Sequence, residues 1–323
     1  MKRLGVLTSG GDAPGMNAAI RAVVRTACYH GLEVLGIKRG YQGLIDDDVV
    51  PLGARSVGGI INRGGTILHS ARCADFMAPE GRARAAQTLA RHGIEGLAVI
   101  GGDGSYRGAQ ALYEEHGVRC IGLPGTIDND IGGTEFTIGY DTALNTAMEA
   151  IDRIRDTAES HDRVFFIEVM GRHSGYLAMM SGVAGGAEAI LVPETLTDID
   201  ELVRDLEAGR AKGKTSAIVV VAEGDDFGKA HAVAERVAEV SIYKNPRVVV
   251  IGHLQRGGTP SAFDRILASR LGLRAVEALI EGETGKMVGV NANNVALRPL
   301  SEAWTCRTQF DPRILRVGHI LAS

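Results

Sequence analysis

Two aspartates stand two residues apart after an apolar run, in the stretch GLPGTIDND of residues 122–130. If the run continues as an extended strand, Asp128 and Asp130 share one face of it. A pair of carboxylates can divide the work of phosphoryl transfer, because one accepts the proton of an attacking hydroxyl while the other addresses a metal ion. The structural alternative is that both aspartates cap the next segment, but a single cap does not explain two carboxylates. The pair therefore predicts a catalytic site.

A third carboxylate, Asp103, lies in the Gly-rich stretch GGDGS of residues 101–105, between an apolar run and a helix-like segment. A carboxylate at a phosphate-binding turn would repel its ligand unless Mg²⁺ lies between them, since Mg²⁺ binds both carboxylate and phosphate oxygens. An Asx-turn or a helix N-cap is the structural alternative for Asp103. Two other Gly-rich turns expected in the same layer favour the metal-linked interpretation.

The stretch TSGGDAPG of residues 8–15 also joins an apolar run to a helix-like segment. Its glycines would let a phosphate approach the N–H groups at the start of the helix, although an ordinary strand-to-helix turn explains the stretch equally well. Compensating positive charge is expected from the turns that carry Arg163, Arg172, His253 and Arg256. A base, a metal ion and a group of arginines are the components of a phosphoryl-transfer site.

The stretch AGRAKGKT of residues 208–215 resembles a Walker A loop, but the likeness is superficial. Ala208 stands where the first glycine is needed, and the stretch follows a helix and precedes a strand, which is the reverse of the Walker order. Lys212 and Lys214 can still bind phosphate as point charges, although a solvated basic turn is the simpler interpretation.

An alternating series of short apolar runs and amphipathic segments must position these residues. The runs are mostly continuous and rich in valine and isoleucine, which is typical of parallel strands covered on both faces. The expected strands are residues 3–8, 33–38, 96–102, 120–125, 164–171, 189–194, 216–223 and 248–254, and residues 291–300 are expected to form a surface loop and an edge strand. The expected helices are Asn17–Tyr29, Glu80–His92, Tyr106–His116, Thr142–Glu159, Asp198–Ala211, Ala230–Val240 and Asp264–Glu281. This order predicts a doubly wound α/β fold, in which ligands bind beyond the carboxyl ends of the strands.

Composition narrows the class of protein. The 323 residues favour about two domains. The formal net charge of −4 argues against nucleic-acid binding, and no apolar run approaches the length of about 20 residues that a membrane span needs. The N-terminus lacks the pattern of a signal peptide. The four cysteines have no CxxC spacing, which argues against a disulfide framework or a zinc site and fits a reducing cytoplasm.

Several motifs occur in the order and with the spacing of one family. They are GVLTSGGDAPGMNAAIR, INRGGT, GGDGS, PGTIDND, EAIDRIRDTA, EVMGR, HLQRGG and DRILASR. Through these motifs most of the chain resembles the bacterial ATP-dependent 6-phosphofructokinases. The resemblance implies two Rossmann-like three-layer domains with mostly parallel sheets and an active site in the cleft between them. Their expected bounds are 1–139 with 254–304 for ATP binding, and 140–253 with 305–323 for fructose 6-phosphate and effectors.

The resemblance implies a step of glycolysis, the transfer of a phosphoryl group from MgATP to the 1-hydroxyl of fructose 6-phosphate. Asp128 is similar to the family's general base and Asp103 to its Mg²⁺-linked aspartate, with Asp130 near the same metal. The other catalytic contacts implied are Thr126, Arg172, Arg72 and the backbone N–H of Gly11. The nucleotide-binding residues implied are Gly11, Arg72, Cys73, Gly102, Asp103, Gly104, Ser105 and Gly108. The sugar-phosphate-binding residues implied are Thr126, Asp128, Asp130, Arg163, Met170, Gly171, Arg172, Glu223, Arg247, His253 and Arg256.

Two glycines predict the phosphoryl donor. Pyrophosphate-dependent relatives carry Asp where this chain has Gly104, and Lys where it has Gly125. A carboxylate at position 104 would repel the α-phosphate of a nucleotide, so the two glycines favour ATP. The alternatives are a pyrophosphate-dependent enzyme, a non-catalytic nucleotide-sensing relative, and an NAD or lipid kinase, in which GGDG also occurs.

The resemblance also implies an oligomer, usually a tetramer, because the family's counterparts of Arg163 and Arg247 reach into the site of a neighbouring subunit. An effector site for ADP or GDP and for phosphoenolpyruvate is implied at Arg21, Arg25, Arg155, Gly186, Glu188, Lys212 and Lys214. This chain departs from the family pattern at Ala54 with Arg55, at Gly58 with Gly59, and at Met77. A side chain shifted by one residue points elsewhere, so an altered effector site is expected.

Overall fold

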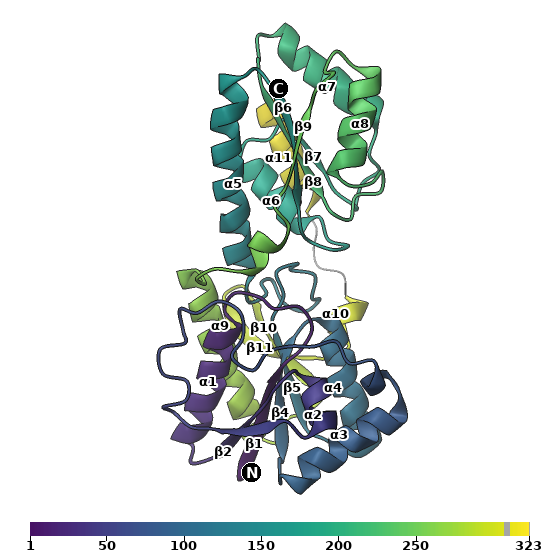
Figure 1. Ribbon diagram of the computed structural model, residues 1–323. Helices are drawn as coiled ribbons and strands as arrows, with labels where there is room; N and C mark the ends of the chain where they lie inside the picture. Colours follow the sequence, from purple (N-terminus) through teal and green to yellow (C-terminus); the bar gives the residue numbers. More distant parts are fainter. Residues whose placement is uncertain (307–310, 323) are drawn as a thin grey trace. The chain divides into compact units, whose positions relative to one another are not determined.

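The computed structural model describes residues 1–306 and 311–322. The chain divides into two compact units, each built from two separate stretches. Unit 1 comprises Met1–Thr142 with Arg256–Thr308, and unit 2 comprises Ala143–Gln255 with Gln309–Ser323. Figure 1 shows the strands and helices of both units, coloured along the sequence from the N-terminus (purple) to the C-terminus (yellow).

Unit 1 is organised around a mostly parallel sheet with the strand order β11-β10-β5-β4-β1-β2-β3. Its strands are β1 (Arg3–Thr8), β2 (Glu33–Ile37), β3 (Val49–Leu52), β4 (Gly96–Gly101), β5 (Cys120–Pro124), β10 (Lys286–Asn291) and β11 (Asn294–Pro299). Strands β3 and β11 run antiparallel to their neighbours at the two edges. Every residue of the central strand β4 is buried, which explains why its sequence is a continuous apolar run.

Helices cover both faces of this sheet (Figure 1). They are α1 (Met16–Tyr29), α2 (Tyr41–Asp46), α3 (Pro79–Arg91), α4 (Asp103–His116), α9 (Ala262–Ile280) and α10 (Glu302–Thr305), with a 3₁₀ turn η1 (Asp75–Met77). Helices α1 and α9 pack together on one face. A core that includes Leu97, Val99, Tyr106 and Leu112 joins the other face to α2, α3 and α4.

Unit 2 has a fully parallel sheet with the order β7-β8-β6-β9. Its strands are β6 (Val164–Val169), β7 (Ala189–Leu191), β8 (Ala217–Ala222) and β9 (Arg247–Val250). Its helices are α5 (Tyr140–Ser160), whose first turn belongs to unit 1, α6 (Tyr176–Ala184), α7 (Ile199–Ala211), α8 (Ala230–Val240) and α11 (Pro312–Ala322), and the 3₁₀ turn η2 (Gly252–Arg256) follows β9. One core packs α5, α6 and α11 against the sheet, and a second packs α7 and α8 against its other face.

The predicted α/β fold with mostly parallel sheets is confirmed. Residues 291–300, expected to form a surface loop and an edge strand, contain an exposed turn at Ala292 and Asn293, both with positive φ, followed by the edge strand β11. One local expectation is wrong, because helix α4 begins at Asp103, earlier than the predicted start at Tyr106. In the described part of the chain, no helix is long and apolar enough to cross a membrane.

A buried carboxylate on α9 holds the start of α5. Asp264 is fully buried and accepts hydrogen bonds from the backbone N–H groups of Gly139 and Thr142, both at 2.9 Å, and from the Thr142 hydroxyl. Burial raises the pKa of Asp264 to about 6, although the hydrogen bonds from Thr142 and Gly139 oppose the rise. The carboxyl group therefore keeps its proton to a higher pH in the folded chain than in the unfolded chain.

We expect Asp264→Asn to change how the free energy of unfolding depends on pH. Between about pH 4 and pH 6 the folded wild type binds more protons than the unfolded chain, so Asp264 makes stability fall as pH rises through this window. The difference in unfolding free energy, wild type minus variant, should fall by about 1–3 kcal/mol across the window and stay flat above it. Denaturant unfolding at a series of pH values measures this difference. Thr142→Val removes a donor that lowers the pKa of Asp264, so it should extend the window to higher pH, and an unchanged window would contradict the assignment.

Candidate active site

The carboxyl ends of three neighbouring strands of unit 1 meet at one edge of the sheet. Strand β4 pairs in parallel with β1 on one side and with β5 on the other. Beyond the strands, the N–H of Ser9 donates to the carbonyl of Ile100 at 2.9 Å, and the N–H of Gly125 donates to the carbonyl of Gly101 at 3.0 Å. The turns that follow β1, β4 and β5 therefore lie side by side, as parallel pairing requires.

The turn after β1 closely approaches a guanidinium group. Gly10 has φ +86°, in the left-handed region that favours glycine. A Cβ atom at Gly11 would lie 2.7 Å from Nη1 of Arg256, and the same Nη1 donates to the carbonyl of Asp12 at 3.0 Å. Arg256, which the family resemblance assigns to the sugar phosphate, therefore places its positive charge directly against this turn of unit 1.

Asp103 is the first residue of α4, and Gly102 is the N-cap of that helix. The N-cap interpretation of Asp103 is therefore wrong. In the first turn, the carboxylate faces the positive end of the helix dipole, and Nε of Arg107 lies 3.9 Å from Oδ2. A Cβ atom at Gly102 or Gly104 would meet no atom within 4 Å, so there is open space on both sides of Asp103.

Asp128 and Asp130 follow β5 in a bent segment. The strand ends at Pro124, and Asn129 has φ +49°, so the prediction that the two aspartates share one face of an extended strand is wrong. Asp128 is buried with 5% of its surface exposed, and Asp130 is half-buried. The N–H of Asp128 donates to Oγ1 of Thr126 at 3.2 Å. Because the next helix begins at Tyr140, neither aspartate caps it, and the structural alternative for the pair does not hold.

The other predicted nucleotide-side residues differ in their surroundings. Arg72 is exposed, and Cys73 packs against the core, where burial raises the pKa of its thiol. Gly108 on α4 has a packing role of its own, because a Cβ atom there would lie 2.8 Å from Tyr41 and 2.9 Å from Phe76. The rings of Tyr41 and Phe76 stack with their centroids 4.0 Å apart.

In unit 2, one glutamate organises the turn after β6. Oε1 of Glu223 accepts from the N–H of Gly171 at 3.2 Å and from the N–H of Arg172 at 2.7 Å. Arg172 has φ +58°, a conformation that costs energy for a residue with a side chain and that these two hydrogen bonds help to hold. The structure therefore brings together Gly171, Arg172 and Glu223, as predicted for one group of sugar-phosphate residues.

Gln255 is a residue of this site that the residue-by-residue prediction missed. It is fully buried in η2, and its Oε1 accepts from the N–H of Met170 at 2.8 Å. Gln255 thus ties η2, which also carries the exposed His253, to the carboxyl end of β6. The motif HLQRGG contains this glutamine, but only its charged members His253 and Arg256 are among the predicted site residues.

Arg163 and Arg247 lie at the opposite end of the unit 2 sheet. Arg163 directly precedes β6, and Arg247 is the first residue of β9, paired with Phe165 near the start of β6. Met170 directly follows β6, so at about 3.3 Å per residue the strand separates it from Arg163 by roughly 20 Å. Within one chain, these two arginines are therefore not part of the group around Glu223.

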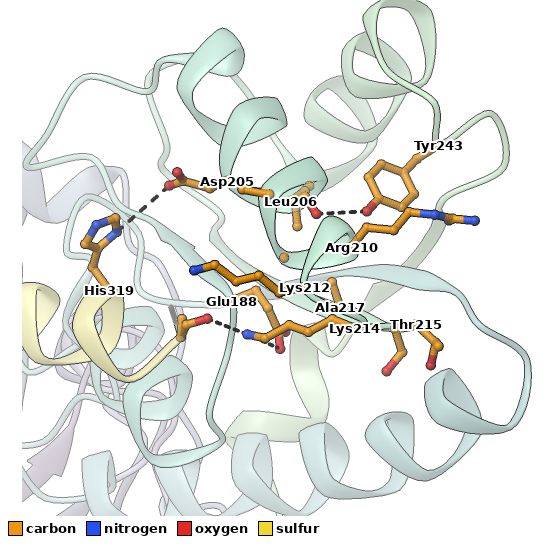
Figure 2. A pocket seen from close by; sticks show the side chains of 14 residues that line it. Glu188, Asp205, Leu206, Arg210, Lys212, Lys214, Thr215, Ala217, Tyr243 and His319 are labelled. Atoms are coloured by element: carbon orange, nitrogen blue, oxygen red, sulfur yellow. Dashed lines mark hydrogen bonds and ion pairs between the residues drawn. The ribbon is translucent and has the colours of Figure 1, made fainter.

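A pocket in unit 2 gathers part of the predicted effector set (Figure 2). Glu188, Lys212 and Lys214 line it, and its volume is about 130 Å³. Lys214 lies 3.8 Å from Glu188 and also donates to the carbonyl of Ala322, whereas Lys212 has no ion-pair partner among the described residues and points its ammonium group into the pocket. The basic stretch thus lines a pocket, instead of forming only a solvated turn.

The remaining effector residues lie elsewhere. Nη2 of Arg155 donates to the carbonyls of Gly185 and Gly186, both at 2.6 Å, and Gly186 has φ +64°. Arg21 and Arg25 lie on α1 in unit 1.

Unit 1 thus presents a buried aspartate and two Gly-rich turns at one edge of a parallel sheet, and unit 2 presents an ordered basic turn. These are features by which α/β enzymes bind anionic substrates beyond the carboxyl ends of their strands. The family model described as "Phosphofructokinase" matches residues 3–279. The chain belongs to the phosphofructokinase family.

Known proteins of this family differ in their similarity to the chain. It is 58% identical to the ATP-dependent 6-phosphofructokinase 1 of Thermus thermophilus, with both sequences covered completely. Among solved structures, it matches a phosphofructokinase from Saccharomyces cerevisiae with a TM-score of 0.88 and 37% identity; all of this chain is covered, but it spans about half (48%) of the yeast chain. A pyrophosphate-dependent phosphofructokinase from Marinobacter aquaeolei matches with a TM-score of 0.86 over all of this chain and 91% of that one; at 24% identity, this likeness concerns the fold alone.

Proposed function

We propose that this chain transfers the γ-phosphoryl group of MgATP to the 1-hydroxyl of fructose 6-phosphate, giving fructose 1,6-bisphosphate. The observation that carries the proposal is the buried Asp128, held beside two Gly-rich turns in a chain 58% identical over its whole length to an ATP-dependent 6-phosphofructokinase. The reaction is a step of glycolysis, and a cytoplasmic location suits it.

Asp128 is the proposed general base. A carboxylate there accepts the proton of the 1-hydroxyl as that oxygen attacks the γ-phosphorus. Because the transition state is metaphosphate-like, this proton needs to be removed only late in the transfer. Thr126, Arg172, Arg72 and the N–H of Gly11 are the proposed contacts to the transferring group. Donors fixed before the reaction stabilise the charge that develops on its oxygens.

Asp103 is the proposed ligand of Mg²⁺, with Asp130 near the same ion. The surroundings of Asp103 fit this role, because Gly102 and Gly104 leave open space for phosphate oxygens and for the waters that Mg²⁺ retains. In the described chain, no group of three or more His, Cys, Asp or Glu side chains is placed to hold a metal, which suits an ion bound mainly through substrate phosphates. When bound, Mg²⁺ would neutralise charge on the transferring phosphate.

Unit 2 is proposed to hold the sugar phosphate through Met170, Gly171, Arg172, Glu223 and His253. Glu223 acts by fixing the backbone of the turn, because it accepts from two successive N–H groups and so orients the side chain of Arg172. From unit 1, Arg256 would add a positive charge near the turn at Gly11.

A neighbouring subunit is proposed to supply Arg163 and Arg247. The two residues lie at the amino end of the unit 2 sheet, away from the turn at Arg172, so a second copy of the chain must bring them to a site if they bind substrate. The proposed assembly is a homotetramer.

Effector binding is proposed in the pocket of Figure 2. A nucleoside diphosphate or phosphoenolpyruvate carries the negative charge that Lys212 and Lys214 can bind. Arg21, Arg25, Arg155, Gly186 and Glu188 complete the proposed set. Ala54, with Arg55 one position later, makes altered regulation the expected outcome.

Initial rates with each phosphoryl donor test the proposed function. ATP with Mg²⁺ should support formation of fructose 1,6-bisphosphate, and pyrophosphate should not. At position 125 a Cβ atom would already lie 3.0 Å from Ile100 and 3.2 Å from Met16, so there is little room for the lysine of pyrophosphate-dependent relatives. A pyrophosphate-dependent rate would overturn the choice of donor, and no rate with either donor would favour a nucleotide-sensing protein that has lost turnover.

Gly104→Asp is expected to raise KM for ATP by at least about tenfold, because the new carboxylate would repel the nucleotide phosphates. The open space at position 104 means that the side chain itself fits, which leaves charge as the cause. Gly104→Asn is the matched control and should have a much smaller effect. Equal effects of the two variants on steady-state kinetics would show that bulk, and not charge, matters at this position.

A further inference from the structure

A short segment of unit 1, residues 134–139, runs beside the end of β5 and is here named the bracing segment. The N–H of Ile138 donates to the carbonyl of Pro124 at 2.7 Å, and Ile138 also forms an isolated parallel bridge with Gly125. The far end of the segment is fixed as well, since the N–H of Gly139 donates to the buried carboxylate of Asp264. The bracing segment is therefore held at both ends.

Thr137 lies in the bracing segment and contacts the chain on both sides of Asp128. Its side chain is fully buried, and its hydroxyl donates to the carbonyl of Thr126 at 2.6 Å. Its backbone N–H donates to Oδ1 of Asn129 at 2.8 Å. One threonine thus fixes the residue two before Asp128 and the residue directly after it.

Asn129, which directly follows Asp128 in the segment after β5, completes the network. Its side chain is 2% exposed, and its Nδ2 donates to the carbonyl of Glu135 at 3.0 Å. With φ +49°, it has a backbone conformation that few residues other than glycine and asparagine adopt readily. The hydrogen bonds to the bracing segment hold this turn, and the turn sets the direction in which the side chain of Asp128 projects from the backbone.

We propose that Thr137, acting through Thr126 and Asn129, is a positioning residue for Asp128. The inference rests on the proposed function, in which Asp128 is the general base. A base must lie within hydrogen-bond reach of the proton that it accepts, and a displacement of about 1 Å can cost about 10²-fold in rate. Because the hydroxyl of Thr137 bonds to Thr126 and Asn129, on either side of Asp128, its loss should disturb the chemical step more than the binding of nucleotide.

Thr137→Val and Thr137→Ser form a matched pair for the test. Valine keeps the shape and the backbone N–H but removes the hydroxyl, whereas serine keeps the hydroxyl. We expect Thr137→Val to lower kcat by about 10- to 100-fold with KM for ATP changed less than twofold, and Thr137→Ser to keep kcat within about threefold of wild type. Steady-state kinetics well below the melting temperature, with the melting temperature of each variant measured in parallel, provides the readout.

A purely structural role predicts another result: Thr137→Val would melt at a lower temperature and yet keep its kcat, and this would overturn the proposal. If Thr137→Val does not fold, Asn129→Gly decides, because glycine keeps the positive φ while removing the side-chain hydrogen bonds of Asn129 with Thr137 and Glu135. The same loss of kcat is then expected, and a normal kcat contradicts the proposal. Asp128→Asn separates this inference from the proposed function: if that variant is inactive while Thr137→Val turns over normally, only the positioning role fails.

Discussion

Asp128→Asn should lower kcat by at least about 10²–10⁴-fold while leaving ATP binding intact. The amide has nearly the same shape as the carboxylate but cannot accept the proton of the sugar hydroxyl. Asp128 is buried beside Thr126 and is the proposed base, not one of the proposed nucleotide-binding residues, so the loss should fall on turnover. Steady-state kinetics gives kcat, and calorimetric titration with an ATP analogue gives the affinity.

Asp200→Asn is a suitable control, because it makes the same chemical change at an exposed carboxylate in the first turn of α7. This variant should keep the wild-type kcat. If Asp128→Asn also turned over at close to the wild-type rate, Asp128 would not be the base.

The second large effect concerns Arg163, which should act in the site of a neighbouring subunit. Arg163→Ala removes a charge-assisted contact to the sugar phosphate, and such a contact is worth about 1.5–3 kcal/mol, so kcat/KM for fructose 6-phosphate should fall by about 10- to 100-fold. KM for ATP should change little. The same kinetic assay with each substrate varied in turn measures both.

Mixed oligomers test whether the arginine acts between subunits. Arg163→Ala chains and Asp128→Asn chains, co-expressed with different tags and purified through both, each lack one part of the site. If a site combines Asp128 of one chain with Arg163 of its neighbour, random pairing restores about one site in four, and about a quarter of the wild-type activity should return. If both residues act within one chain, no site is restored. Activity then stays at the low level of the two single variants, which would refute the shared site.

Helices with regular patterns could be predicted closely from the sequence. Helix α8 has the predicted bounds, and α7 begins within one residue of its prediction because the Asp198 side chain accepts the N–H of Glu201 as an N-cap. Helix α6 was missed because Leu177, Ala178 and Met179 are all buried, and a helix that is apolar on most sides lacks the amphipathic period. The short α2 was missed because its six residues span less than two turns.

The strand order that positions the candidate site was predictable, but the local geometry of its turns was not. The parallel strand order brings the turns at Gly11, Asp103 and Asp128 together, and that order follows from the alternation of runs and helices. The positive φ of Asn129 depends on hydrogen bonds from Thr137 and to Glu135, which lie six to eight residues further along the chain. No local pattern shows such bonds, so the extended-strand expectation for Asp128 and Asp130 failed.

Contacts between distant parts of the sequence account for the rest. Asp264 reaches Gly139 across 125 positions, and Gln255 reaches Met170 across 85. Both side chains are fully buried and hydrogen-bonded to backbone groups, as buried polar groups generally are. Such pairs become visible only when the fold has set two elements side by side.

A crystal structure of the wild type with fructose 6-phosphate, Mg²⁺ and a non-hydrolysable ATP analogue tests the assignment of the base most directly. An oxygen of the Asp128 carboxylate should lie within about 2.6–3.2 Å of the sugar's 1-hydroxyl oxygen, with that oxygen aligned toward the γ-phosphorus. A complex in which both ligands are bound and the Asp128 carboxylate faces away from the hexose would contradict the account.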